Sequence, residues 1–204
     1  MRRQNHGVFS MNIALSISHD LATGRTFAML LGTSEEQTWW ILDQLSDLPM
    51  LASHPLFLPT MLSKYTLSHV AYRVRLLHDA LKDFEMQSKR TRFMNVTLAD
   101  CDPTEELKKH DELRKDVLQI IQLATAWEDM LRTCSSMTEG IRQANKRIKF
   151  GTARQRRKVV KEVGAILDER SQFTRDETQN LVSQLQFVKE RTQAQMNAIH
   201  HIIA

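Results

Sequence analysis

The chain has 204 residues, a formal net charge of +4, and a composition of 42% hydrophobic and 25% charged residues. This composition is ordinary for a folded protein and argues against intrinsic disorder over most of the chain. The small positive surplus implies only a general attraction to phosphate groups. Two cysteines are too few for a disulfide framework, which favours a reducing compartment.

No stretch of the sequence is apolar over the roughly 18 to 20 consecutive residues that a membrane-spanning helix needs. Arg2 and Arg3 near the start are followed by polar residues, not by the apolar run of a signal peptide. We therefore expect a chain that does not itself cross a bilayer and that resides in the cytoplasm.

The first predicted element is a β-hairpin. Apolar and small polar residues alternate from Asn12 to Ser18, which is typical of a half-buried strand, and Arg25 to Leu31 forms the return strand. Asp20 and Gly24 in the connection are residues that turns favour. An isolated hairpin is marginal in water, so it must pack on helices or join more strands. The segment 7–10 is the one further short strand that the sequence offers.

A short helix is predicted next. Thr33 with Glu36 and Ser34 with Gln37 each have the spacing of a capping box, and Pro49 stands just beyond the predicted end of the helix. Trp39 and Trp40 lie within it, and we interpret them as core anchors in preference to a stacking site, because nothing basic or glycine-rich surrounds them.

The segment from Ser53 to Thr60 opens the second, long helix, since proline is tolerated in a first helical turn. Two apolar stripes run along this helix, which predicts that more than one neighbour buries it. One stripe is Leu67, Val70, Val74, Leu77, Leu81 and Phe84, and the other is Leu58, Leu62, Tyr65, Tyr72 and Leu76.

Thr104 is predicted to cap a third helix, which carries the most specific pattern in the chain. Its seam residues alternate four and three apart, as in a coiled coil. They are Leu113, Val117, Ile120, Ala124, Trp127, Leu131, Cys134, Thr138, Ile141, Asn145 and Ile148. The polar Asn145 either fixes the register of this seam or marks a helix end that is exposed to water.

The chain is predicted to reverse at Gly151, and residues 152–204 then form one very long helix. Its apolar face, expected to pack on the seam of the third helix, comprises Val159, Val163, Ile166, Phe173, Leu181, Leu185, Val188, Met196, Ile199 and Ile203. The expected fold is mainly α, with a small N-terminal β-hairpin and long antiparallel helices in a bundle or coiled-coil hairpin. Residues 1–50 would hold the hairpin and short helix, and residues 51–204 the bundle.

Basic residues gather where the third helix turns into the fourth. This basic tip consists of Lys146, Arg147, Lys149, Arg154, Arg156, Arg157, Lys158 and Lys161. It is interpreted either as a patch for phosphate, anionic lipid or an acidic partner, or as the solvated ends of two helices, and the second interpretation is favoured. Phe150 is the one aromatic residue among them, which argues against binding of single-stranded nucleic acid by stacking.

The sequence shows no pattern for catalysis or metal binding. The histidines, which include His54, His69 and His78, are not spaced as a ligand set, and we interpret them as scattered surface residues. There is no glycine-flanked nucleophile and no phosphate-binding glycine loop. We therefore expect a protein that is not an enzyme, with no catalytic, metal-binding or cofactor-binding residues.

Three parts of the chain resemble the cytoplasmic part of fungal CorA-like divalent-cation transporters. They are the hairpin from Asn12 to Leu31, the segment from Ser53 to Thr60 that enters a long helix, and the closing stretch from Gln184 to Ala204. In that family a strand-containing domain is followed by long helices, and the last helix continues into the membrane. The resemblance implies that Arg191 to Ala204 correspond to the pre-membrane helix.

The family's Gly-Met-Asn pore motif and its membrane spans have no counterpart in this sequence, so no pore residue is assigned. The resemblance therefore implies a regulatory or oligomerisation domain that cannot conduct ions by itself, that acts as a homo-oligomer or with partner helices, and that takes no small-molecule substrate. Magnesium is a cofactor by resemblance only, and membrane association would require a longer transporter. The alternative is a soluble helical adaptor whose basic tip binds nucleic acid or an anionic membrane.

Overall fold

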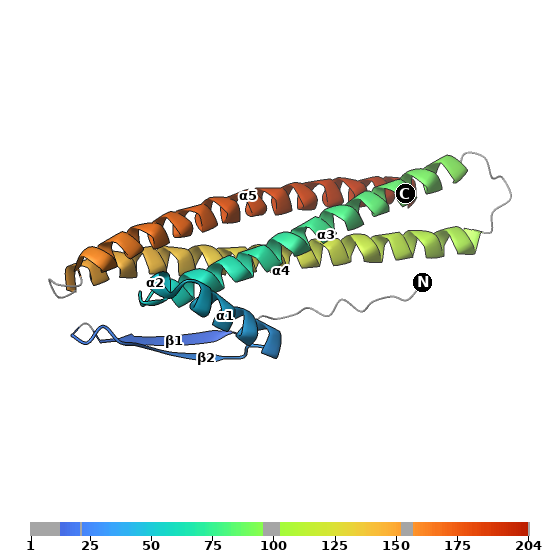
Figure 1. The fold of residues 1–204 in the computed structure, drawn as a ribbon. Helices are drawn as coiled ribbons and strands as arrows, with labels where there is room; N and C mark the ends of the chain where they lie inside the picture. Colours follow the sequence, from blue (N-terminus) through green and yellow to red (C-terminus); the bar gives the residue numbers. More distant parts are fainter. Residues whose placement is uncertain (1–12, 21, 96–102, 152–156, 204) are drawn as a thin grey trace. The chain divides into compact units, whose positions relative to one another are not determined.

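The computed structural model describes residues 13–20, 22–95, 103–151 and 157–203. The elements in chain order are β1 (Ala14–His19), β2 (Thr26–Leu31), α1 (Glu35–Asp47), α2 (Pro49–Ala52), α3 (Phe57–Asn95), α4 (Pro103–Gly151) and α5 (Arg157–Ile203) (Figure 1). The predicted class, mainly α with a small N-terminal hairpin and long packed helices, is confirmed. The short strand expected at 7–10 and most of the expected reversal after Gly151 lie outside the described residues.

The chain forms two compact units. Unit 1 comprises residues 1–62 and 140–171, and unit 2 comprises residues 63–139 and 172–204. Each of the three long helices contributes a stretch to both units.

The hairpin of unit 1 is an antiparallel pair in which Ser16 faces Met29 and Ile17 faces Ala28. Its turn is held by Asp20, whose carboxylate accepts hydrogen bonds from the Ala22 N–H at 2.9 Å and the Thr23 hydroxyl at 2.6 Å. Gly24 follows with φ of 68°, a conformation that glycine adopts without strain. No residue of either strand is buried, so the hairpin adds little to the core of its own chain.

Of the two capping boxes that the sequence offers at the start of α1, the one formed by Ser34 and Gln37 is confirmed. The Gln37 N–H donates to Ser34 Oγ at 3.2 Å, and the Ser34 N–H donates to Gln37 Oε1 at 2.8 Å. The interpretation of Trp39 as a core anchor is wrong, because its side chain is 62% exposed while Ile41 faces inward. Adjacent residues of a helix point about 100° apart, so a Trp pair cannot share one buried face.

The segment between α2 and α3 is tightly packed. His54, predicted to lie on the surface, is only 2% exposed, and its Nδ1 accepts the Leu56 N–H at 3.2 Å. The imidazole thereby satisfies a backbone donor in the tight turn that leads into α3, and this local bond explains its burial. Pro59 lies in the first turn of α3, as predicted, and the Thr60 hydroxyl donates to the Leu56 carbonyl at 2.8 Å.

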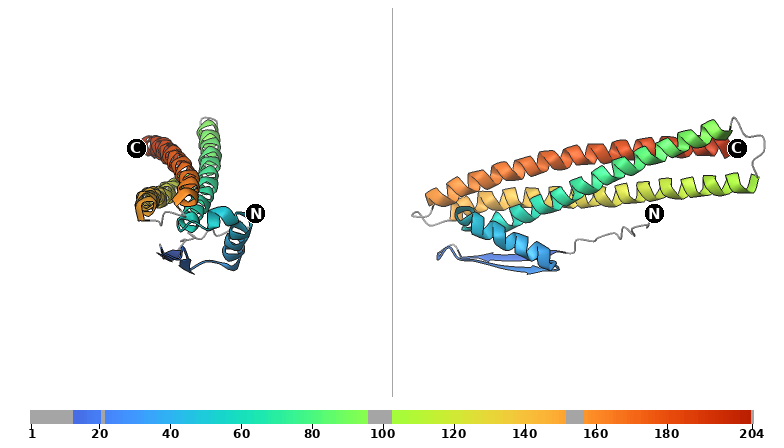
Figure 2. Two further views of the ribbon diagram at one scale, coloured as in Figure 1. Left: turned by 60° about the vertical axis from the view of Figure 1, so that its left-hand side comes forward. Right: turned by 45° about the vertical axis from the view of Figure 1, so that its right-hand side comes forward.

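Unit 2 is a bundle of three helical stretches that run side by side (Figure 2). Its core joins the first predicted stripe of α3 to α4 and α5 and consists of Leu67, Val70, Val74, Leu77, Leu81, Phe84, Val117, Ile120, Ala124, Trp127, Leu131, Leu181, Leu185, Val188 and Met196. The second predicted stripe of α3 is less covered, because Tyr72 is exposed.

The α4 seam is buried at nearly every predicted position. Leu113 is half-buried, whereas Val117, Ile120, Ala124, Trp127, Leu131 and Ile141 are buried. Helix α4 begins at Pro103, so Thr104 lies inside the first turn, and its prediction as the cap is wrong. Proline at the first position is compatible with a helix start because its missing N–H needs no partner there.

The predicted apolar face of α5 is wrong at three positions in its first half, although Val163 is buried as predicted. Val159, Ile166 and Phe173 are exposed, while Leu167, which the apolar pattern omits, is buried. The buried face continues through residues that alternate three and four apart and include hydroxyl side chains, namely Gly164, Leu167, Ser171, Thr174, Thr178, Leu181, Leu185, Val188 and Thr192. Val159, Ile166 and Phe173 lie instead on a different, outward-facing stripe.

Candidate functional site

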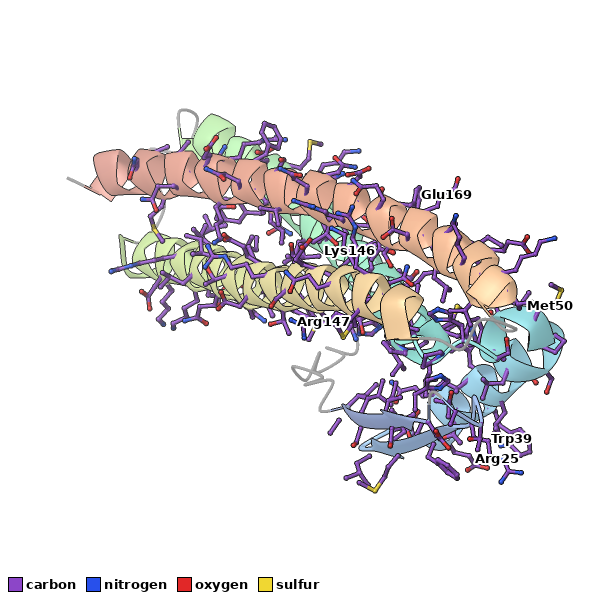
Figure 3. The ribbon with its side chains drawn as sticks, turned by 90° about the vertical axis from the view of Figure 1, so that its left-hand side faces the viewer. Arg25, Trp39, Met50, Lys146, Arg147 and Glu169 are labelled. Atoms are coloured by element: carbon purple, nitrogen blue, oxygen red, sulfur yellow. The ribbon has the colours of Figure 1, made fainter. Side chains whose placement is uncertain are left out.

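The basic tip is described in part. Lys146 and Arg147 on α4 and Lys158 and Lys161 on α5 are exposed in unit 1, and Figure 3 shows the first two on α4. The side chains of the remaining tip residues, Lys149, Arg154, Arg156 and Arg157, lie outside the described part of the chain. The described cations therefore give an accessible basic surface on α4 and α5.

The stretches of α4 and α5 in unit 1 are joined by polar contacts. The Asn145 side chain is 2% exposed, and its Nδ2 donates to the Gly164 carbonyl at 2.7 Å. Arg142 forms an ion pair with Asp168 at 3.4 Å on the rim of the same contact. Because Asn145 is buried and bonds to the facing backbone, the structure favours a register-fixing role over a water-exposed helix end.

In unit 2 the α3 and α4 stretches share a buried hydroxyl pair. Ser63 Oγ and Thr138 Oγ1 are 3.1 Å apart, and the Thr138 hydroxyl lies 2.8 Å from the Cys134 carbonyl of its own helix. On α5 the Thr178 hydroxyl similarly donates to the Thr174 carbonyl at 2.7 Å. Such bonds satisfy the hydroxyl groups locally, which lets small polar side chains occupy a seam without a large desolvation penalty.

Ion pairs join α4 to α5 in unit 2. Lys189 donates to Glu128, which also accepts from Arg132 at 2.6 Å. The hydrogen bond from Lys189 is the main reason that the pKa of Glu128 lies below its ordinary value. A second pair joins Arg175 to Glu139 at 3.7 Å. From the first pair to the second the residue number increases on α4 and decreases on α5, so the two helices are antiparallel.

Helix α3 runs parallel to α5 in this unit. Arg191 pairs with Glu85, and its guanidinium lies 5.2 Å from the ring centroid of Phe187. The same phenyl ring stacks on His78, with centroids 6.5 Å apart. This cluster closes one edge of the bundle with an ion pair, a cation–π contact and an aromatic stack, each a modest contribution.

A second aromatic cluster lies between α3 and α4. The rings of His69 and Trp127 meet edge to face with centroids 6.3 Å apart, and Arg73 lies 5.9 Å from the Trp127 ring. Burial, with a smaller effect of the Arg73 charge, lowers the pKa of His69. His69 is therefore partly covered, contrary to the prediction of a surface histidine, because it packs beside a seam residue.

Helix α5 carries an exposed apolar stripe besides its buried face. We call the residues Val159, Ile166 and Phe173 the outer stripe of α5; they are 49%, 43% and 65% exposed. Successive members are seven residues apart, so they follow one side of the helix. All three belong to the face that the apolar spacing predicts for the core. The signal that separates the two stripes is the unbroken three-four spacing of the buried one, which includes Ser171 and Thr174.

Among the described residues, no group of three or more His, Cys, Asp or Glu side chains is placed to hold a metal ion. No helix in the described ranges has an apolar stretch long enough to span a bilayer. Comparison of the chain with protein-family models, with curated proteins and with solved structures finds no match in any of the three.

Proposed function

We propose that this chain is a non-catalytic helical scaffold that assembles with further copies of itself through α5. The observation that carries the proposal is the outer stripe of α5, which is apolar, regularly spaced and exposed, while a separate face of the same helix is already buried in its own chain. A helix with two apolar stripes needs a second neighbour that buries the second stripe. A stripe with a seven-residue spacing suits the packing of another long helix.

The resemblance to CorA-like transporters supports a more specific role for this scaffold. The chain would then be the regulatory and oligomerisation region of a divalent-cation transporter, and α5 would be the helix that leads toward the membrane. Magnesium would act as a ligand of the assembly. A cation that binds between protomers favours the assembled state by mass action.

Light scattering of the purified chain, with and without millimolar magnesium, tests the proposal. We expect a mass above that of one chain, and a magnesium-dependent change would support the transporter assignment. Phe173→Ser together with Ile166→Ser should reduce the mass toward the monomer. Tyr72→Ser, which alters a comparably exposed aromatic residue on α3, is the matched control and should leave it unchanged. A monomer at all concentrations, with or without magnesium, contradicts the proposal.

A second candidate is an adaptor whose basic tip docks on nucleic acid or anionic membrane, and the exposure of Lys146, Arg147, Lys158 and Lys161 favours it. Charge reversal by Lys158→Glu and Lys161→Glu should abolish binding to a polyanion, and the binding should weaken steeply with salt. Absence of binding to either duplex DNA or phosphatidylserine vesicles at moderate salt would remove this candidate.

A further inference from the structure

We propose that β2 is a docking edge for β2 of a second copy of this chain, so that the two hairpins form one four-stranded antiparallel sheet. This inference rests on the proposed self-association, but it names a different contact from the outer stripe of α5. The hairpin of unit 1 is the starting point, because its two strands pair with no further strand among the residues that the structure describes.

The hairpin is exposed on the face that carries Phe27, Met29 and Leu31, whereas Leu15, Ile17 and Leu30 on the other face are half-buried. Within the described ranges, β1 is the only strand that pairs with β2. No residue of either strand is buried, and Phe27, Met29 and Leu31 on one face of β2 are all more than half exposed. A two-stranded hairpin is at best marginally stable in water, whereas three or more strands with an apolar face can persist.

The backbone N–H and C=O groups on the open edge of β2 suit pairing with another strand. The Asp20 N–H donates to the Arg25 carbonyl at 2.9 Å, which fixes the alternation of the ladder between β1 and β2. By that alternation the N–H and C=O groups of Thr26, Ala28 and Leu30 face away from β1. A row of unpaired donors and acceptors is a template for another strand.

The composition of β2 leaves this edge unprotected. Natural edge strands are usually blocked by Lys, Pro, a bulge or an inward-pointing charge. The six residues of β2, Thr26–Leu31, contain no charged residue and no proline. The same face of β1 carries Ala14, Ser16 and Ser18, so β2 is the more apolar of the two strands there.

A second copy fits this edge without a clash of charges. If a twofold axis passes through Met29, Phe27 of one chain lies opposite Leu31 of the second copy, and Met29 lies opposite its own equivalent. Every cross-strand pair on the exposed face is then apolar, which is a favourable arrangement. Arg25 lies outside β2, so no charged side chain stands within the paired strands. The strand is therefore complementary to itself, as a twofold interface requires.

Disulfide trapping tests the register. In this arrangement Met29 and its equivalent form a non-hydrogen-bonded pair, whose Cα atoms are about 4.5 Å apart, within the range of a disulfide. Met29→Cys in the full-length chain should give a covalent dimer under mild oxidation, with the linked peptide identified by mass spectrometry. Ser16→Cys, on the same face but one strand further from the axis, would be about 14 Å from its equivalent and should not cross-link.

Met86→Cys is the matched control for residue type, because Met86 is also about half exposed but lies on α3. Cross-linking of Met29→Cys at least about tenfold faster than both controls is expected, since only this pair satisfies the disulfide geometry. Equal rates for all three variants, or no link through position 29, would overturn the inference.

A second variant separates this contact from the helical one. Ala28→Pro removes an N–H that faces the open edge, a position where proline is tolerated within an edge strand. It should preserve the circular dichroism spectrum but raise the dimer dissociation constant at least about tenfold.

If Ala28→Pro keeps the wild-type mass while the Phe173 and Ile166 variant loses it, the edge contact is wrong and the scaffold proposal stands. If Ala28→Pro loses the wild-type mass while the Phe173 and Ile166 variant keeps it, the edge contact stands and the α5 contact is wrong.

Discussion

Asn145 on α4 donates its side-chain amide to the Gly164 carbonyl on α5 at 2.7 Å, from a position where the side chain is only 2% exposed. The bond is specific to one alignment of the two helices, since a shift by one residue would bring another backbone group or a side chain opposite the amide. It therefore acts on the register of the α4–α5 contact in unit 1 as well as on its stability.

Asn145→Ala should lower the free energy of unfolding by about 1 to 3 kcal/mol, because it removes a buried hydrogen bond together with the packing of the amide. Urea denaturation followed by circular dichroism measures this. Lys146→Ala changes the adjacent, exposed residue and should have an effect below about 0.5 kcal/mol. Equal effects of the two substitutions would contradict the assigned role of Asn145.

The corrected register of α5 predicts a contrast between two neighbouring residues. Leu167→Ala should cost about 2 to 5 kcal/mol, because Leu167 is 1% exposed and its truncation leaves a cavity. Ile166→Ala should change the free energy of unfolding by less than about 0.5 kcal/mol in the isolated monomer, because Ile166 is 43% exposed. Thermal or urea unfolding at low protein concentration, where self-association is minimal, distinguishes the two. The reverse order of effects would restore the register that the apolar residues alone suggest.

The pair Glu128 and Lys189 should couple α4 to α5 by about 0.5 to 1 kcal/mol, measured by a double-mutant cycle with Glu128→Gln and Lys189→Met. The folded-state pKa of Glu128 is depressed below its ordinary value of 4.5, chiefly by the hydrogen bond from Lys189. Its contribution is therefore present above pH 4.5 and is lost as the pH falls through the folded-state pKa. A coupling that stays constant from about pH 7 to about pH 3 would argue against the ion pair.

His69 should titrate below its ordinary pKa of 6.5, because burial beside Trp127 and the charge of Arg73 both disfavour the imidazolium form. A histidine with a lowered folded-state pKa stabilises the protein most above about pH 6.5, and this contribution falls as the pH drops toward the folded-state value. Heteronuclear NMR of the imidazole gives the pKa directly. Arg73→Gln should raise the pKa of His69, and a pKa at or above 6.5 in the parent chain would refute the prediction.

Cys134 should resist alkylation in the native protein. The side chain is 2% exposed, and burial raises the pKa of its thiol to about 11, so little thiolate exists near neutral pH. Treatment with iodoacetamide at about pH 8, followed by peptide mapping, should leave Cys134 unmodified in buffer and modify it in urea. Rapid native labelling would indicate that this part of the seam opens readily.

The sequence alone predicted the fold class, the capping box of α1, the first stripe of α3 and the α4 seam. Each depends on a local period or on a short-range hydrogen bond. Val117, Ile120, Ala124 and Leu131 are apolar and spaced in steps of three, four and seven, and a helix with that spacing has only one face to bury. The same reasoning applies to Ser34 and Gln37, whose reciprocal bonds lie within a single turn.

Tertiary structure decided the rest. Hydropathy favoured Ile166 and Phe173 for the buried face of α5, whereas the packed face contains Ser171 and Thr178, whose hydroxyl groups donate to carbonyls of their own helix. Side chains that satisfy themselves in this way need no apolar character to enter a seam, so composition does not reveal them. The exposure of Trp39 and of the face of β2 that carries Met29 likewise depends on which neighbours cover them, and one chain's sequence does not specify its neighbours.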